Sequence, residues 1–210
     1  MTDPDFEAIL PARFYEREGH ELARALLGQI VVRTSAHGTV AGRIVELEVY
    51  GGTDDPACHA DRGVPTARTR TMFGEPGTTY VYKIYGIYDC FNVVGARGAN
   101  GKVTAILVRA LEPVFGLELM MQRRSRSRAT NLGERDLLSG PGKLCQAFDI
   151  DRSLDGADLQ SQPLCIVRGA AVPPGDVETT PRIGLNPDTC GPSADFQWRY
   201  VVASSPFRSR

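Results

Sequence analysis

The segment 43–50 carries the residues whose types and spacing could do chemistry. Its apolar residues alternate with Glu46, Glu48 and Tyr50. On a β-strand this alternation turns the apolar side chains toward a core and places two carboxylates and a tyrosine on the opposite face. His59 lies in the polar loop that follows. Taken alone, the pattern fits the wall of a pocket or a solvated edge strand equally well.

Two carboxylates on one face of a strand allow two kinds of chemistry. Residues i and i+2 lie about 6–7 Å apart along the backbone, which is compatible with paired acid–base chemistry on a glycoside. One carboxylate alone could instead orient a water and stabilise a developing cation. The spacing does not choose between Glu46 and Glu48.

A tyrosine-rich β-hairpin is predicted next, with strands over 78–84 and 88–94. Tyr80 and Tyr82 share one face, where packing within the sheet is the alternative to a role in a pocket. Tyr85 lies at the tip beside a glycine, and a tip has little sheet for an aromatic ring to pack against. Side chains that project in this way unstack the duplex in some DNA-binding proteins.

Basic residues gather in three places. One group lies in the loop over 51–77, and a second forms a run at a helix end, where it could equally complement a helix dipole on a solvated face. The segment SGPGK (139–143) offers free backbone N–H groups at a helix start, which is a weak signal for phosphate binding. The arginines of the first two groups are Arg62, Arg68 and Arg70, then Arg123, Arg124, Arg126 and Arg128.

Composition indicates one ordinary globular domain. The chain has 210 residues, 42% hydrophobic residues and a formal net charge of −1, so bulk charge does not indicate a polyanionic partner. Five dispersed cysteines without a CxxC motif argue against a zinc ribbon, an iron–sulfur site or a disulfide framework. With an acidic N-terminus and no long apolar run, we expect a cytoplasmic protein with reduced thiols and no membrane span.

Neither a nucleophilic cysteine nor a metal site is expected. The side chains of Cys58 and His59 are adjacent in sequence and should point apart, which suits a nucleophile–base pair badly. Asp54, Asp55 and His59 match no familiar spacing of metal ligands. We therefore expect neither a metal nor a cofactor.

The elements that position these residues indicate the α+β class. We expect a single compact domain over 1–210, in which a mixed or antiparallel curved sheet is flanked by helices and carries the protruding hairpin. Residues 1–11 are expected to be loosely ordered. Besides the hairpin, helices are predicted over 16–27, 113–124 and 139–146, and strands over 29–34, 40–50, 103–109, 164–168 and 198–203.

Six motifs in a fixed order resemble the alkyladenine (3-methyladenine) DNA glycosylase family. The resemblance covers most of residues 12–207, and several motifs in one order are more specific than any one of them. The motifs are RIVELEVY (43–50), ACH (57–59), RTRTMF (68–73), PGTTYVYKIYG (76–86), VRALEP (108–113) and LSGPGKLCQA (138–147).

The resemblance implies a monofunctional DNA glycosylase of base excision repair, acting as a monomer on double-stranded DNA. Such an enzyme flips an alkylated or deaminated purine (3-methyladenine, 7-methylguanine, hypoxanthine or ethenoadenine) out of the duplex and hydrolyses its N-glycosidic bond. Glu48 would be the general base that activates the water. Arg109 would help to hold that water, with the main-chain carbonyl near Ile183 as a third partner.

The resemblance also implies roles for the aromatic and basic residues. Tyr50, His59 and Tyr82 would wall the pocket around the flipped base, with Asn92 on its floor. Tyr85 would fill the gap in the duplex, helped by Met72. The phosphates would be anchored by Arg62, Arg68, Arg70 and Lys143, beside Ser139 and Gly140.

Two other functions remain open at this stage. A hydrolase of free nucleosides or glycosides would use Glu46 and Glu48 as a pair, but it leaves Tyr85 and the arginines unexplained. A non-catalytic nucleic-acid-binding module would stack bases on the tyrosines, with Glu48 incidental.

Overall fold

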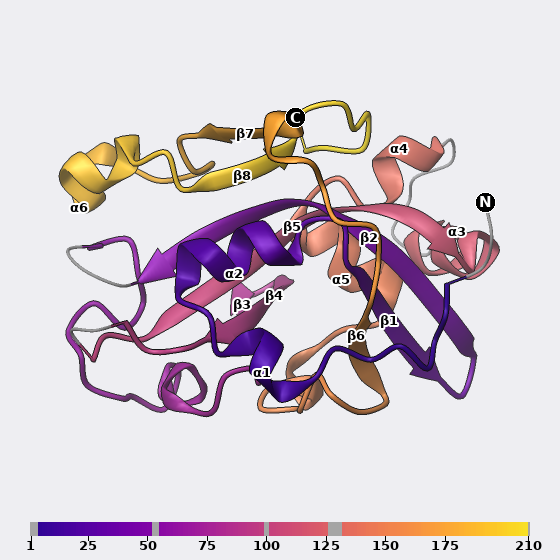
Figure 1. Ribbon diagram of the computed structural model, residues 1–210, viewed down its shortest axis with the longest axis horizontal. Coiled ribbons are helices and arrows are strands. Elements are labelled where there is room, and N and C mark those ends of the chain that lie inside the picture. The colour runs from indigo at the N-terminus through magenta and orange to yellow at the C-terminus, as the bar shows by residue number, and fades with distance from the viewer. Residues whose placement is uncertain (1–3, 52–54, 99–100, 126–131, 210) are drawn as a thin grey trace.

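An antiparallel sheet of eight strands forms the centre of the computed structural model (Figure 1), which describes residues 4–51, 55–98, 101–125 and 132–209. The main path of the sheet runs β3–β4–β5–β2–β1–β6, while β8 joins β2 and carries β7 at its outer edge. The strands are β1 (Ile30–Ser35), β2 (Gly38–Gly51), β3 (Thr79–Ile84), β4 (Tyr88–Gly95), β5 (Thr104–Phe115), β6 (Leu164–Val167), β7 (Val177–Thr180) and β8 (Arg199–Val202).

The longest strand, β2, holds the sheet together and carries the acidic segment. One of its edges pairs with β5 along almost its whole length. The other edge pairs first with β1 and then, from Glu46 to Glu48, with β8. The acidic segment is therefore enclosed by strands on both sides, which excludes the reading of a solvated edge strand.

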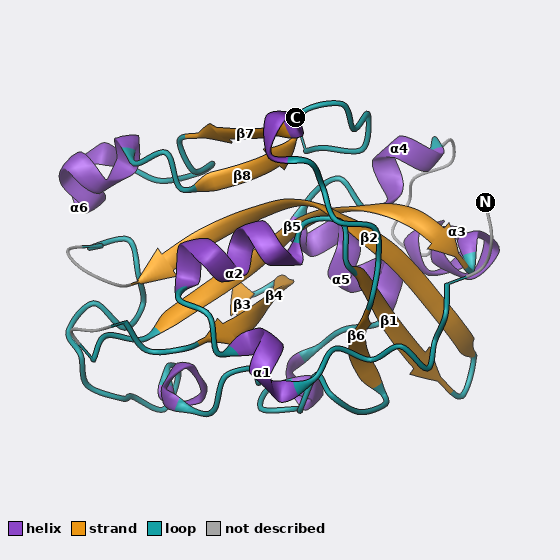
Figure 2. Cartoon of the chain, viewed as in Figure 1, coloured by secondary structure: helices purple, strands orange, loops and turns teal. Residues whose placement is uncertain are grey.

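Helices cover both faces of this sheet. In the view of Figure 2, α2 lies in front of the sheet and α5 behind it, and their apolar residues belong to one buried cluster with those of β2 and β5. The helices are α1 (Ala12–Tyr15), α2 (Gly19–Leu26), α3 (Leu117–Ser125), α4 (Glu134–Leu137), α5 (Pro141–Phe148) and α6 (Pro187–Cys190). Short 3-10 helices are η1 (Arg70–Phe73), η2 (Arg152–Leu154), η3 (Pro174–Asp176) and η4 (Gly191–Asp195).

The predicted α+β domain with a projecting β3–β4 hairpin is confirmed, whereas the predicted helix over 113–124 begins too early. Strand β5 continues through Pro113 to Phe115, and α3 begins only at Leu117. Pro113 pairs with Gly42 beside an irregularity in the ladder, where a proline is tolerated in a sheet. Gly116, with φ 78°, then turns the chain into the helix.

The N-terminal segment is more ordered than the sequence suggested. Leu10 donates its N–H to Ile166 on β6, and Arg168 donates its N–H to Ala8. The expectation of a loose segment over 1–11 therefore fails for residues 8–10, because they pair with the open edge of β6. Residues 1–3 lie outside the described part of the chain.

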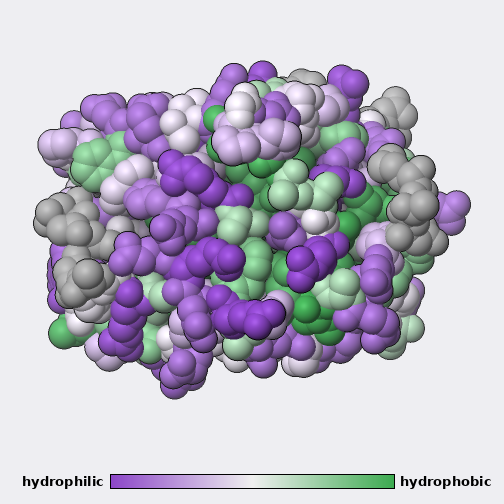
Figure 3. Space-filling view, viewed as in Figure 1, coloured by the Kyte–Doolittle hydropathy of each residue, from purple (hydrophilic) through white to green (hydrophobic). Residues whose placement is uncertain are grey.

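The surface in Figure 3 is mostly hydrophilic, with scattered apolar patches. Within the described residues, no helix combines the length and the apolar character needed to cross a bilayer.

The sequence did not predict strand β7 or the helices α4 and α6. Each of these elements is only four residues long and lacks a clear periodic pattern.

The end of β2 depends on a glycine. Gly51 has φ 109°, and a Cβ at this position would lie 2.2 Å from the carbonyl oxygen of Val103. We expect Gly51→Ala to lower the free energy of unfolding by at least about 2 kcal/mol, since the positive φ alone costs roughly 1–2 kcal/mol. The measurement is the urea unfolding curve of each variant. Gly63→Ala is the control, because its φ of 69° is also positive but no atom lies within 4 Å of the added Cβ. Equal losses in the two variants would contradict the steric argument.

Candidate active site

Glu48 on β2 is fully buried, and three donors hold its carboxylate. The Tyr50 hydroxyl donates to Oε2 at 2.8 Å, and Nη1 of Arg109 donates to the same oxygen at 3.3 Å. The main-chain N–H of Ile183 donates to Oε1 at 2.6 Å. A carboxylate has about four acceptor positions, so one position on Oε1 is left for a further donor such as a water.

Glu46, the other candidate, accepts hydrogen bonds from four donor groups instead of three. Its Oε1 accepts from Nε of Arg109 at 2.9 Å, from Nε of Arg199 at 2.8 Å and from the Ser209 hydroxyl at 2.6 Å. Its Oε2 accepts from the main-chain N–H of Ser209 at 2.6 Å. Burial alone would raise the pKa of Glu46, but the hydrogen bonds from Arg199 and Ser209 outweigh it and lower that pKa. The contacts with Arg109, Arg199 and Ser209 therefore indicate a structural role for Glu46.

Arg109 links the two carboxylates because of a β-bulge. Glu46 pairs with Ala110 and Leu47 pairs with Val108, so Arg109 is the extra residue on β5 and its side chain turns toward β2. Burial opposes its charge, yet Glu48 and Glu46 raise the pKa of its guanidinium above the ordinary value. Removing one partner of such a buried pair leaves the other charge uncompensated, which is costly.

Arg182 positions Tyr50 and was missed by the sequence analysis. Its guanidinium lies over the ring of Tyr50 at 4.7 Å and over that of Trp198 at 5.1 Å. It also pairs with both oxygens of Asp55, at 2.7 and 2.8 Å. Because the next residue is Ile183, the same arginine fixes the N–H that holds Glu48. No local sequence signal marks Arg182, since Tyr50 and Asp55, which it contacts, lie more than 100 positions away in the sequence.

An aromatic cavity of about 30 Å³ adjoins this carboxylate. That is room for about two waters, so a purine base enters only if side chains at the mouth move. Tyr50 links the cavity to Glu48 through its hydroxyl, and burial followed by the nearby Glu48 charge raises the pKa of that hydroxyl, which stays a donor. The cavity is lined by Tyr50, Ala57, His59, Met72, Tyr80, Tyr82, Asn92 and Ala105.

Two of these residues are fixed by their neighbours. The side-chain nitrogen of Asn92 donates to the main-chain carbonyl of Tyr80 at 2.9 Å, which sets the orientation of the amide. The rings of His59 and Tyr82 meet edge to face, with centroids 4.6 Å apart. Packing within the sheet was the alternative role for Tyr80, but its side chain lines the cavity together with that of Tyr82.

Arg68 lies at the mouth of the cavity. Its Nη2 contacts Nε2 of His59 at 3.1 Å, and its guanidinium lies over the ring of Tyr82 at 5.2 Å. An arginine can only donate, so Nε2 of His59 accepts and Nδ1 carries the proton that faces the Tyr80 hydroxyl at 3.1 Å. Burial and the charge of Arg68 lower the pKa of His59 to about 4, so its ring is neutral at pH 7.

The hairpin tip projects as the sequence suggested. Tyr85 is 81% exposed and adopts φ 53°, and Gly86 follows with φ 70°. Two successive positive φ values fit a type I′ turn, and a tyrosine in this conformation carries local strain. The turn thus presents an aromatic ring to solvent at the end of the hairpin.

Met72 and Ile183 differ from the prediction. Met72 is 2% exposed and lines the cavity, because η1 folds beneath the tyrosines; it does not stand beside Tyr85. Ile183 does not line the cavity, and it presents its N–H to Glu48. Its carbonyl makes no hydrogen bond among the described residues.

The basic candidates separate into different environments. Arg62 and Arg70 are exposed, and Lys143 contacts the Ser139 hydroxyl at 3.1 Å beside Gly140. The first turn of α5 packs on Tyr88, which pairs with Ile84 next to the hairpin tip, so this segment and the tip lie close together. Arg123 and Arg124 are buried against Ala147 and Gln146 and are not on a solvated face. Arg126 and Arg128 lie outside the described residues.

The described residues contain no group of three or more His, Cys, Asp or Glu side chains that could hold a metal ion. Cys58 is buried, and burial raises the pKa of its thiol to about 11. The described site contains a buried carboxylate, a guanidinium and aromatic side chains.

The site thus combines a buried carboxylate, an aromatic cavity and an exposed tyrosine at the hairpin tip, and comparison with known proteins gives the class of the protein. The model of the methylpurine-DNA glycosylase family matches residues 13–206, and the chain belongs to that family. Its relatives carry the name of a hydrolase of N-glycosyl bonds in DNA, and this protein is accordingly an enzyme of that type.

Similar proteins occur in archaea, bacteria and mammals. The chain is 45% identical over 203 residues to "Putative 3-methyladenine DNA glycosylase" of Methanocella arvoryzae, covering 96% of each chain. It is 44% identical over 200 residues to a protein of the same name from Herpetosiphon aurantiacus, covering 94% of this chain and 86% of that one. It is 42% identical over 213 residues to "DNA-3-methyladenine glycosylase" of Mus musculus, covering 98% of this chain but only 62% of the mouse protein.

The contact between Arg68 and His59 predicts a titration behaviour. We expect the imidazole of His59 to titrate with a midpoint near pH 4, and Arg68→Ala to raise that midpoint, because both burial and the Arg68 charge lower it. The measurement is the imidazole NMR signal against pH. Since the folded state releases this proton more readily than the unfolded state, stability falls as the pH drops from 6.5 toward 4. An unchanged midpoint in Arg68→Ala would show that Arg68 does not act on His59.

Proposed function

We propose that the protein is a monofunctional DNA glycosylase that excises damaged purines flipped out of duplex DNA. The observation that carries this proposal is the contrast between the two buried carboxylates. Glu46 accepts four hydrogen bonds, from Arg109, Arg199 and Ser209. Glu48 accepts three, and one of them comes from Tyr50 on the wall of the aromatic cavity. Glu48 is therefore the better candidate for a general base that acts on a water.

The chemistry suits a damaged purine. Alkylation makes the base cationic or electron-poor, so the electron-rich faces of Tyr50 and Tyr82 bind it better than a normal base. The neutral ring of His59 adds no repulsion to a cationic base. As the base leaves, the sugar gains oxocarbenium character, and the ionised carboxylate of Glu48 stabilises it while orienting the attacking water.

Flipping would be supported by the hairpin. Extruding a nucleotide costs a few kcal/mol, and less for a damaged or mispaired base. The exposed ring of Tyr85 would fill the space that the base leaves, and the Ser139–Lys143 segment, which packs on Tyr88 next to the tip, would hold phosphates. One flipped nucleotide needs no symmetric partner, so we propose a monomer on double-stranded DNA. The substrate class is alkylated or deaminated purines, from 3-methyladenine and 7-methylguanine to hypoxanthine and ethenoadenine.

Single-turnover base release tests the role of Glu48. We expect wild type to release ethenoadenine or hypoxanthine from a duplex, and Glu48→Gln to release it at least about 100-fold more slowly, since general-base catalysis contributes that much or more. Binding of the same duplex should persist in the variant.

Glu46→Gln is the matched control, because it removes a carboxylate from the same strand. It should lower the melting temperature but slow base release far less than Glu48→Gln. If both variants lost release equally, a paired-carboxylate mechanism would replace this one. If wild type released no base even from methylated DNA, a binding module would be the better interpretation.

A second test concerns the fate of the sugar. The chain has only three lysines, and none of Lys83, Lys102 and Lys143 lines the aromatic cavity. No Schiff-base nucleophile is therefore near the reacting carbon. We expect an abasic strand that stays intact until alkali is added, and no covalent complex after treatment with borohydride. A borohydride-trapped adduct in wild type would show a lyase mechanism instead.

A further inference from the structure

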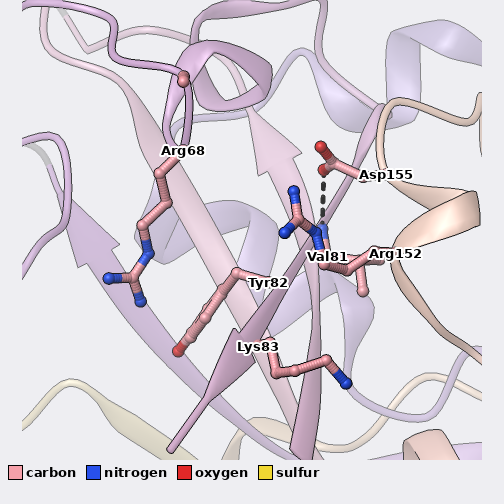
Figure 4. A pocket seen from close by; sticks show the side chains of 7 residues that line it. Arg68, Val81, Tyr82, Lys83, Arg152 and Asp155 are labelled. Atoms are coloured by element: carbon pink, nitrogen blue, oxygen red, sulfur yellow. Dashed lines mark hydrogen bonds between the residues drawn. The ribbon is translucent and has the colours of Figure 1, made fainter. Parts of the chain in front are cut away.

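A second and larger cavity, of about 390 Å³, lies beside the base pocket and takes no part in the reaction proposed above. Figure 4 shows its side chains, which come from three separate segments of the chain, with Tyr82 and Lys83 pointing to opposite sides of β3. Tyr82 lines both cavities, so its ring separates the outer one from the base pocket. The outer cavity is lined by Ala67, Arg68, Val81, Tyr82, Lys83, Arg152 and Asp155.

The lining of this cavity is predominantly cationic. Arg68, Lys83 and Arg152 face a single carboxylate, that of Asp155. Both oxygens of this carboxylate already accept hydrogen bonds at 3.0 Å, one from the main-chain N–H of Val81 and one from the Thr71 hydroxyl. Asp155 therefore secures the loop to β3, and of the three cations Lys83 is paired with a different carboxylate, that of Asp89.

Two of the cations keep donors for a ligand. The guanidinium of Arg152 makes no hydrogen bond or ion pair with any residue in the described ranges. The ammonium of Lys83 pairs with Asp89 at 3.0 Å, which uses one of its three donors. The guanidinium of Arg152 and the remaining N–H donors of the Lys83 ammonium line the same cavity, and such groups are chemically suited to bind a phosphate.

The free edge of β3 adds a main-chain donor. The N–H of Val81 points away from β4 toward Asp155, and in an antiparallel ladder residues two apart point the same way. The N–H of Lys83 therefore faces the same edge, and it has no partner among the residues that the structure describes. Main-chain N–H groups beside cations are a common feature of phosphate sites.

The cavity also lies where a DNA strand should pass. Lys83 precedes the tip residue Tyr85 by two positions on the hairpin, about 7 Å along an extended strand. This is close to the rise of two nucleotides on one DNA strand. A strand whose stack is opened by Tyr85 would therefore bring a neighbouring phosphate to Lys83.

We propose that Arg68, Lys83 and Arg152 form a binding site for a backbone phosphodiester next to the flipped nucleotide. This inference rests on the proposed function for its choice of DNA as the ligand. It assigns a role to Lys83 and Arg152, which the reaction itself does not use.

The site has a consequence for the base pocket, because Arg68 belongs to both. In the free protein Arg68 bonds to the neutral ring of His59 at the pocket mouth. A phosphate anion is a stronger partner for a guanidinium than a neutral imidazole. Phosphate binding in the outer cavity would therefore draw Arg68 away from His59 and widen a pocket that is otherwise too narrow for a purine.

The test is the salt dependence of binding to an undamaged duplex, measured by fluorescence anisotropy. Each phosphate contact contributes about 0.9 to the slope of log Kobs against log salt. We expect the double variant Lys83→Gln/Arg152→Gln to bind more weakly and its slope to be less steep by about 0.9. Lys83→Arg should keep most of the wild-type slope, since the charge remains.

Arg168→Gln is the matched control. Arg168 is exposed and follows β6, at the opposite end of the main sheet path from β3, so its loss should leave the slope unchanged. Because the duplex is undamaged, the result does not depend on base release, and failure of this inference is distinct from failure of the proposed function. An unchanged slope in the double variant would overturn the proposal.

The other source of a phosphate group is a free anion. Inorganic phosphate titrated calorimetrically into the wild-type protein separates the two sources. Weak binding of inorganic phosphate together with the altered slope supports a DNA phosphodiester. Submillimolar binding of inorganic phosphate with no change of slope in the double variant would overturn the DNA assignment.

Discussion

The burial of two carboxylates on one strand is the constraint on which the rest of the structure depends. Ionised groups removed from water carry a penalty of several kcal/mol each unless charges and hydrogen bonds compensate it. For Glu46 and Glu48 the compensation comes from β5 through Arg109, from β8 through Arg199 and from the C-terminal segment through Ser209 and Ile183. The attachment of β8 to the second half of β2 thus follows from the acids as much as from apolar packing.

The same network distinguishes the two carboxylates. They are similarly buried, but four donor groups reach Glu46 and three reach Glu48. The donors of Glu46 include a hydroxyl and an N–H from Ser209, both at 2.6 Å, whereas Glu48 receives its third partner from a tyrosine that also lines the pocket. Arg182, held by Asp55, fixes that tyrosine from behind, so the pocket and the carboxylate are aligned by one ion pair.

Local pattern was enough for the parts of the site that lie on one element. Alternation placed Glu48 beside Tyr50, and the glycine after Tyr85 marked the exposed tip. The local pattern could not show that a bulge on β5 would turn Arg109 toward β2. Nor could it show that Arg182 and Ser209, from the distant C-terminal segment, would contact Asp55 and Glu46. The prediction that Met72 would stand beside Tyr85 was wrong, because the sequence does not show that η1 folds under the tyrosines. Pro113 suggested a helix start, but the bulged ladder accommodates it in a strand.

The near-neutral net charge becomes compatible with DNA binding once individual acids are placed. Asp89, close to the hairpin tip, pairs with Lys83, and Asp155 bonds to β3 and to Thr71. Glu46 and Glu48 are enclosed and face no solvent. These carboxylates hold cations and strands in position, so their negative charge is balanced locally and does not project toward a DNA phosphate. The field that a duplex meets is therefore set by the cations left unpaired at one edge of the sheet, and not by the total charge of the chain.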